Sequence, residues 1–124
     1  MPRRFPRSRD DALLDAVEAS DRIIFWLTGK TLVDYESDEL LRSGVERKFE
    51  IFSEALRIAD EQDPALRESL PRLGEVIGMR NTLAHGYFNV DDDVVWSAAT
   101  RFLPELRERI LLLLNDDDSD SPNI

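Results

Sequence analysis

The sequence predicts an all-α fold, an up-and-down bundle of four to five helices in one domain. Apolar residues recur three or four positions apart over several long stretches, the pattern of a helix with one buried face. No stretch alternates apolar and polar residues as a half-buried strand does. The chain has 124 residues, of which 42% are hydrophobic, which is enough to enclose a single core.

The first predicted helix begins at Asp10 or Asp11, either of which could cap it. It ends at Gly29, because glycine readily adopts the left-handed conformation that follows many last helical turns. The segment 30–36 is then expected to be a connector. The apolar positions with helical spacing are Leu13, Val17, Ile24 and Leu27.

A long second helix is expected after Ser37, a candidate N-cap followed by two acidic residues that suit the positive end of a helix. Asp63 and Pro64 end this helix, because the residue before a proline is disfavoured in the helical conformation. A short helical turn is predicted at 66–70. The core-facing positions of the second helix are Leu41, Val45, Phe49, Phe52, Leu56 and Ala59.

The third predicted helix carries the stretch around which the chain is organised. Pro71 is expected at its first position, where a missing N–H costs little, and Gly86 lies just past its end. Gly78 lies inside this helix at a cost of about 1 kcal/mol relative to alanine, which suggests that another backbone or a ligand approaches it. His85, the only histidine, falls in the last turn. Acid–base chemistry near neutral pH would therefore pass through His85.

Arg80 and Tyr87 accompany His85 in this stretch. On an ideal helix, positions 80 and 87 lie about 20° apart, whereas position 85 lies about 140° from position 80. Convergence of the three side chains therefore requires that the helix ends here or that a second chain contributes. From spacing alone we favour structural roles, such as capping by His85 or pairing of Arg80 with an acidic residue. Glu54, near the apolar face of the second helix, is a candidate partner for Arg80.

A fourth helix is expected after the 87–90 loop, with Asp91 or Asp92 as its cap. The acidic run that includes Asp93 is interpreted as this cap with solvated neighbours rather than as a metal site. Pro104 interrupts the apolar pattern, so it either kinks this helix or starts a fifth one. The apolar positions are Val95, Ala99, Phe102, Leu106, Ile110 and Leu113.

Charge and composition limit the possible chemistry. Residues 1–9 form a basic N-terminal tail, 10–114 the helical domain and 115–124 an acidic C-terminal tail. The net charge of −10 excludes a general basic surface for nucleic acid, so any RNA contact must be local. The absence of cysteine rules out Cys-based zinc sites, and one histidine leaves no His-rich metal site within one chain, so we expect no metal and no cofactor. No apolar run approaches a membrane span of roughly 20 residues, so we expect a cytoplasmic protein without a membrane partner.

Residues 80–87, Arg-Asn-Thr-Leu-Ala-His-Gly-Tyr, match an ordered motif of a known family. They resemble the R-x-x-x-x-H-x-Y motif of HEPN-domain ribonuclease toxins, specifically HepT-like proteins of MNT/HEPN toxin–antitoxin pairs. The resemblance covers roughly residues 21–113, and two departures affect packing: Phe52-Ser53 stands where the family often has Ile-Gly, and Leu73 where it commonly has tryptophan. Supporting segments are residues 53–55, 77–81, 87–91, 95–96 and 103–106.

The resemblance implies a homodimeric HEPN-type bundle in which Arg80 and His85 of both chains line one cleft and cleave RNA without a metal. By the same resemblance, Asn81 is a supporting residue that orients the phosphate or joins two helices, and Glu54 supports the site. Tyr87 is the implied acceptor of AMP, transferred by a cognate MNT nucleotidyltransferase antitoxin.

Two other readings remain open from the sequence. In the first, the chain is a non-catalytic HEPN accessory subunit that binds a nucleotidyltransferase. Such modules often lack the arginine and histidine of the motif, which are present here. Alternatively, it would be a helical dimer in which Arg80, His85 and Tyr87 are structural. A neighbouring gene for a small nucleotidyltransferase would disfavour the purely structural reading.

Overall fold

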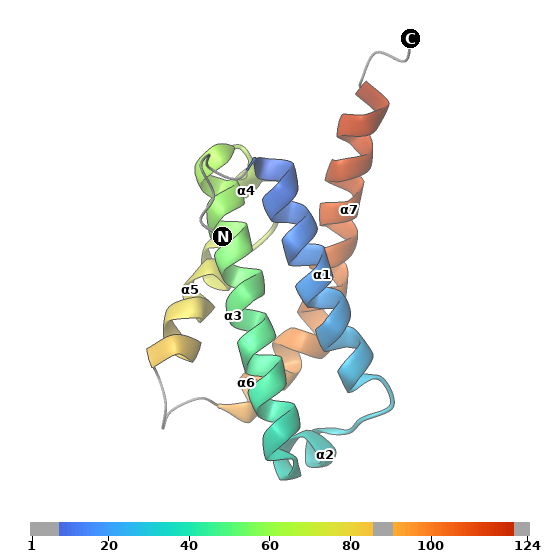
Figure 1. Ribbon diagram of the computed structural model, residues 1–124, viewed down its shortest axis with the longest axis vertical. Coiled ribbons are helices and arrows are strands. Elements are labelled where there is room, and N and C mark those ends of the chain that lie inside the picture. The colour runs from blue at the N-terminus through green and yellow to red at the C-terminus, as the bar shows by residue number, and fades with distance from the viewer. Residues whose placement is uncertain (1–7, 86–90, 121–124) are drawn as a thin grey trace, which may run out of the picture.

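The computed structural model describes residues 8–85 and 91–120, and for 80–82, 84–85 and 117–120 it describes the backbone alone. All regular structure within these ranges is helical, which confirms the all-α prediction. The longer helical segments pack around one core, while the short helices Leu32–Ser37 and Leu66–Ser69 lie at opposite ends of the bundle (Figure 1). The elements are α1 (Arg9–Leu27), α2 (Leu32–Ser37), α3 (Glu39–Gln62), α4 (Leu66–Ser69), α5 (Leu73–His85), α6 (Asp92–Ser97), the π-helical turn η1 (Ala98–Phe102) and α7 (Leu103–Asp120).

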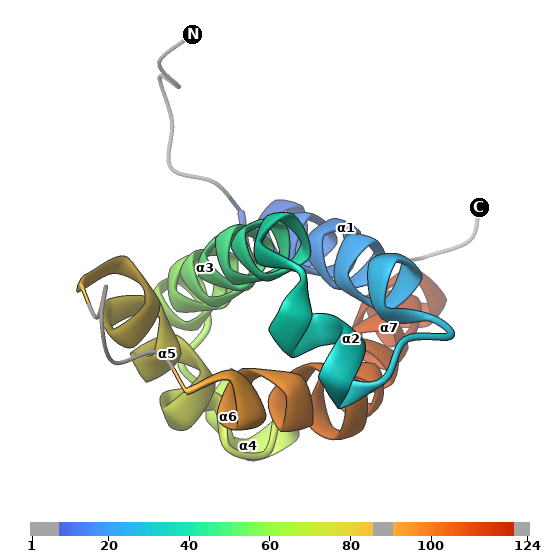
Figure 2. The same ribbon diagram turned by 90° about the horizontal axis from the view of Figure 1, so that it is seen from below.

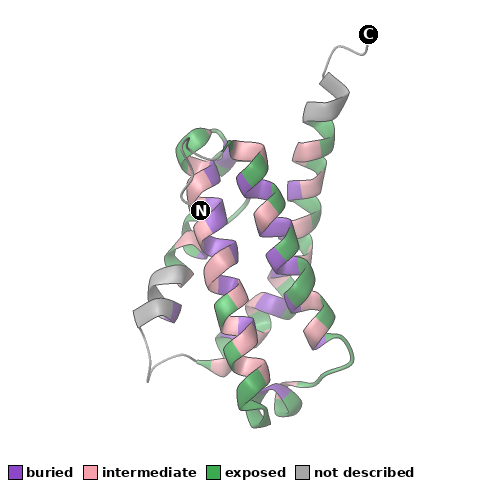
Figure 3. Ribbon diagram, viewed as in Figure 1, coloured by how far each residue is buried: buried purple, intermediate pink, exposed green. Residues whose placement is uncertain are grey.

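The core forms where α1 and α5 meet the apolar face of α3 and where α7 packs on α1. Buried residues run in stripes along α1 and α3 (Figure 3), as the helical periodicity predicted. The rings of Phe49 and Phe52 meet edge to face with centroids 6.1 Å apart. Of the predicted core-facing positions of α3, all but the half-buried Leu41 are buried.

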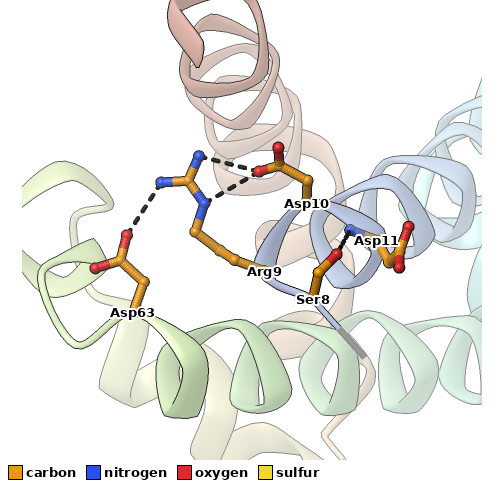
Figure 4. Close-up of polar contacts among 5 residues, drawn as sticks. All are labelled: Ser8, Arg9, Asp10, Asp11 and Asp63. Atoms are coloured by element: carbon orange, nitrogen blue, oxygen red, sulfur yellow. Dashed lines mark hydrogen bonds and ion pairs between the residues drawn. The ribbon is translucent and has the colours of Figure 1, made fainter. Parts of the chain in front are cut away.

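The N-cap of α1 is Ser8, so the prediction of Asp10 or Asp11 is wrong. The Ser8 hydroxyl accepts a hydrogen bond of 3.1 Å from the backbone N–H of Asp11, and the two aspartates occupy the first turn, where their charges suit the helix dipole. Arg9 donates to Asp63 at 3.0 Å and joins the start of α1 to the end of α3 (Figure 4). At the other end, Gly29 has φ of 78° and terminates the helix as predicted.

The predicted connector at 30–36 contains helix α2. Thr31 and Asp34 form a capping box, in which each side chain accepts a hydrogen bond from the backbone N–H of the other residue. Helix α2 lies across one end of the bundle (Figure 2) and buries Tyr35 there. Because Ser37 belongs to α2, the cap of α3 is Asp38, whose carboxylate accepts from the N–H of Leu41 at 3.0 Å.

The single turn α4 confirms the short helix predicted after Pro64, but α5 begins two residues later than predicted. Arg72 has φ of 61°, a left-handed conformation that a helix interior excludes. Pro71 therefore precedes the helix and does not open it. The Arg72 carbonyl accepts the first N–H groups of α5, from Glu75 and Val76, at 3.1 Å each.

Asp91 caps α6, as one of the two predicted alternatives, and its carboxylate accepts from the N–H of Asp93 at 2.9 Å. The predicted alternatives for Pro104 were a kink and the start of a further helix, and the structure has a π-helical turn, η1, followed by α7, which begins one residue before Pro104. In this turn the Leu103 N–H donates to the Ala98 carbonyl, and the proline nitrogen one residue later has no hydrogen to donate. Helix α7 continues past residue 114, and the domain limits set by composition stay a prediction.

Candidate functional site at the end of α5

Helix α5 carries the motif because one of its faces packs on α3. Leu73, Val76 and Leu83 are buried on that face, at spacings of three and seven residues that return to one side of a helix. The helix continues through His85, which is its last residue. The motif histidine therefore lies in the last helical turn, as predicted.

Positions 80 and 85 lie on different sides of α5. Position 80 follows Val76 by four residues and precedes Leu83 by three, so it shares the register of the face packed on α3. Position 85 follows Gly78 by seven residues and shares the register of exposed residues. Because α5 continues from position 80 through position 85, the angular separation inferred from the sequence holds for the backbone. The contribution of a second chain stays a prediction.

Gly74 and Gly78 both lie on the exposed side that includes position 85. A Cβ atom at position 78 would meet no atom within 4 Å, and one at position 74 would meet only the tip of Arg67 at 3.3 Å. Within the described part of the chain, nothing requires glycine at position 78. The close approach inferred from the sequence is therefore not made by any described residue of this chain, and it stays a prediction.

Glu54 lies on α3, and its described partner is Arg57 one turn later. The guanidinium donates to the Glu54 carboxylate through Nε at 2.8 Å, and Nη2 lies 2.6 Å from the same oxygen. These hydrogen bonds raise the pKa of Arg57 above its ordinary value. The predicted pairing of Glu54 with Arg80 stays a prediction, because the Arg80 side chain lies outside the described part of the structure.

The other predicted site residues also lie partly or wholly outside the described set. The backbone places Asn81 in α5 next to Arg80, and Tyr87 falls in the segment 86–90, which is not described. The second tyrosine, Tyr35, is fully buried and its ring packs on Trp96 with centroids 5.7 Å apart. Burial raises the pKa of Tyr35, and the charges of nearby carboxylates raise it further.

A polar cluster that the sequence did not reveal surrounds the Tyr35 hydroxyl where α6 begins. Arg42 of α3 donates to the carbonyl of Glu36, and its Nε lies 3.8 Å from Asp92 of α6. Burial, and secondarily the charge of Asp92, raises the pKa of Glu46 above its ordinary value. The cluster joins α2, α3 and α6 next to the segment that follows His85. Its members come from three separate helices with no shared periodicity, so the sequence offered no signal for it.

The helices whose residues are described include none that is both long and apolar enough to cross a membrane.

Comparisons of the chain with a family profile and with known proteins indicate the same family. The profile of the family described as "Ribonuclease HepT-like" matches residues 13–113. The chain is 31% identical over 101 residues to "Probable ribonuclease HepT" of Thermococcus cleftensis, covering 82% of this chain and 91% of that protein. It is 27% identical over 113 residues to "Putative RNase MJ1216" of Methanocaldococcus jannaschii, covering 90% of this chain and 91% of the other. No solved structure shows a significant match.

The family match spans the helices from the first turns of α1 into α7, and it includes the whole of α5 with its arginine and histidine. The resemblance inferred from residues 80–87 is thereby confirmed at the level of the family. The chain belongs to the HepT-like ribonuclease family.

Proposed function

We propose that the chain is a metal-independent endoribonuclease, the toxin of a toxin–antitoxin pair, which works as a homodimer and uses Arg80 and His85. The observation that carries the proposal is the family match over 13–113, with the Arg80 to His85 motif intact at the end of α5. Relatives that the chain covers almost completely bear ribonuclease names. The organisation of α5 supports the dimer, because positions 80 and 85 lie on different sides of one helix.

The chemistry follows from the two side chains. A neutral imidazole takes the proton of a ribose 2′-hydroxyl, and the oxygen attacks the adjacent phosphorus. A protonated imidazole gives its proton to the departing 5′-oxygen, which leaves a 2′,3′-cyclic phosphate and a 5′-hydroxyl. The permanently charged Arg80 stabilises the extra negative charge on the phosphorus oxygens. One chain has one histidine, so a dimer supplies the second proton-transfer group.

Regulation is proposed to act through Tyr87. The cognate MNT nucleotidyltransferase would join the phenol oxygen of Tyr87 to the α-phosphorus of ATP and release pyrophosphate, with magnesium serving the transferase. The adduct adds bulk and a negative charge two residues after His85, where it would oppose the phosphate of an RNA substrate both sterically and electrostatically. Asn81 and Glu54 are assigned supporting roles.

The test is RNA cleavage by variants that remain folded and dimeric. His85→Ala and Arg80→Ala should each abolish cleavage and growth inhibition, while helical content and mass in solution stay unchanged. Arg109→Ala is the matched control for loss of an arginine, because Arg109 lies on α7 outside the motif and its described partner is Glu105, which has no proposed role in the site. If His85→Ala retains activity, the chain cleaves RNA through another site. If the parent protein itself cleaves no RNA, the chain is instead the non-catalytic accessory subunit.

A further inference from the structure

A groove of about 520 Å³ lies beside α5, between its first half and the α6–η1 segment, which neighbours α5 in Figure 2. We call it the α5–η1 groove. Its apolar part is formed by Val76 and Met79 of α5 and by Ala98 and Phe102 of the turn η1. The volume falls within the range of about 300–1,000 Å³ that is usual for small-molecule sites. Met79 immediately precedes Arg80, so the groove reaches the motif along α5.

One side of the groove is a flat platform. The guanidinium carbon of Arg72 lies 5.2 Å from the centroid of the Phe102 ring. Arg72 also donates to Glu75 at 2.7 Å, so its charge is largely compensated while its planar face remains stacked. Arg72 lies at the groove with a left-handed φ of 61°, just before the first residue of α5.

The other side carries a cation without a described partner. Arg101 lines the groove and is exposed, and among the described side chains no carboxylate lies within ion-pair distance of its guanidinium. Two carboxylates also line the groove: Glu75 binds Arg72, and Asp93 lies in the first turn of α6. The groove thus combines an apolar floor, an arginine stacked on a phenylalanine ring, and the charges of Arg101 and Asp93, which form no ion pair with each other among the described side chains.

From these features we infer that the α5–η1 groove binds one unpaired nucleotide of the RNA substrate. Unpaired bases stack on aromatic rings and on arginine planes, and a phosphodiester can pair with the guanidinium of Arg101, which has no ion-pair partner among the described side chains. One flat platform and one cation offer no specific recognition of a peptide segment from a protein partner. The inference rests on the proposed ribonuclease function and gives that site a second contact with its substrate, within about one helical turn of Arg80.

The experiment measures binding of a labelled single-stranded RNA whose 2′-hydroxyls are all methylated, so that cleavage through the 2′-oxygen is blocked. Arg101→Gln should raise the Kd about five- to tenfold and lower the slope of log Kd against log salt concentration by about 0.7, the effect of one lost phosphate contact. Ser97→Phe places a ring in the groove from an exposed position and should raise the Kd to a similar extent with the slope unchanged. Arg22→Gln, which removes an exposed arginine of α1 outside the groove, should leave both quantities unchanged.

The inference is wrong if Arg101→Gln and Ser97→Phe both bind like the parent, or if Arg22→Gln has the same effect as Arg101→Gln. It is also wrong if the two groove variants bind RNA normally but lose binding to the nucleotidyltransferase, which would make the groove a protein-binding surface. Cleavage of ordinary RNA by the parent protein separates the two claims. A parent that cleaves while the variants bind unchanged overturns the groove alone, whereas a parent that neither binds nor cleaves RNA overturns both.

Discussion

The substitution Gly78→Ala distinguishes a monomeric chain from a dimer whose interface includes α5. Among the described residues of the chain, the new Cβ would meet no atom within 4 Å, so we expect no steric cost in the monomer. Alanine is favoured over glycine in a helix interior by about 1 kcal/mol, and the free energy of unfolding of the monomer should rise by that amount. If a second chain packs on the face that includes Gly78 and position 85, the methyl group instead enters the interface. We then expect the dimer dissociation constant to rise at least about tenfold.

The assay is sedimentation equilibrium over a range of concentrations, combined with urea unfolding at low and high concentration. Gly44→Ala is the matched control, because its Cβ would lie 3.3 Å from the indole of Trp26 in the same chain. Its effect on stability should therefore be the same at every concentration. A Gly78→Ala protein that is about 1 kcal/mol more stable at all concentrations, with unchanged association, would refute the argument that a partner approaches this face.

Three further predictions concern the two tyrosines and Glu46. Incubation with the cognate nucleotidyltransferase, ATP and magnesium should attach AMP to Tyr87 and not to the buried Tyr35. The ribonuclease activity of Tyr87→Phe should escape silencing. Mass spectrometry that places AMP on Tyr35 would contradict this prediction. Tyr35→Phe should leave the free energy of unfolding unchanged or raise it by up to about 1 kcal/mol, because the buried hydroxyl has no acceptor among the described residues, and a clear loss in urea unfolding would reveal a partner. Burial raises the pKa of Glu46 in the folded protein above its ordinary value. The parent should therefore lose stability relative to Glu46→Gln as the pH rises through that folded pKa, because the buried carboxyl then becomes charged. A urea midpoint of the parent that rises with pH relative to that of Glu46→Gln would contradict this argument.

The long helices could be predicted because each buries a face with helical periodicity. Val45, Phe49, Phe52 and Leu56 were expected to face the core, and all are buried. The limits of the helices were less predictable, since several adjacent residues could act as caps. Ser8 and Asp10 are both good N-caps, and the choice depends on which one the backbone leaves in the extended conformation.

Helix α2 escaped prediction for a physical reason. It contributes a single buried residue, Tyr35, so no periodic apolar pattern marks it. The left-handed Arg72 was equally hidden, because arginine has no preference for that conformation and its position is fixed by tertiary contacts with Phe102 and Glu75.

The position of the candidate site was predictable, but its assembly was not. The spacing of Arg80 and His85 placed both on the third long helix, and the backbone of α5 agrees. In the proposed dimer, the groups that meet around a substrate phosphate come from two chains, and a single sequence does not encode that geometry in any local pattern. The α5–η1 groove also depends on the widened turn before Pro104, for which the proline was the only local signal.

Analysis of the RNA product ends tests the central claim most directly. The purified protein is incubated with RNA in the presence of a strong chelator, and the products are examined by mass spectrometry beside those of His85→Ala. We predict 2′,3′-cyclic phosphate and 5′-hydroxyl ends from the parent protein and no products from the variant. Products with 5′-phosphate ends, a requirement for magnesium, or equal cleavage by His85→Ala would contradict the account.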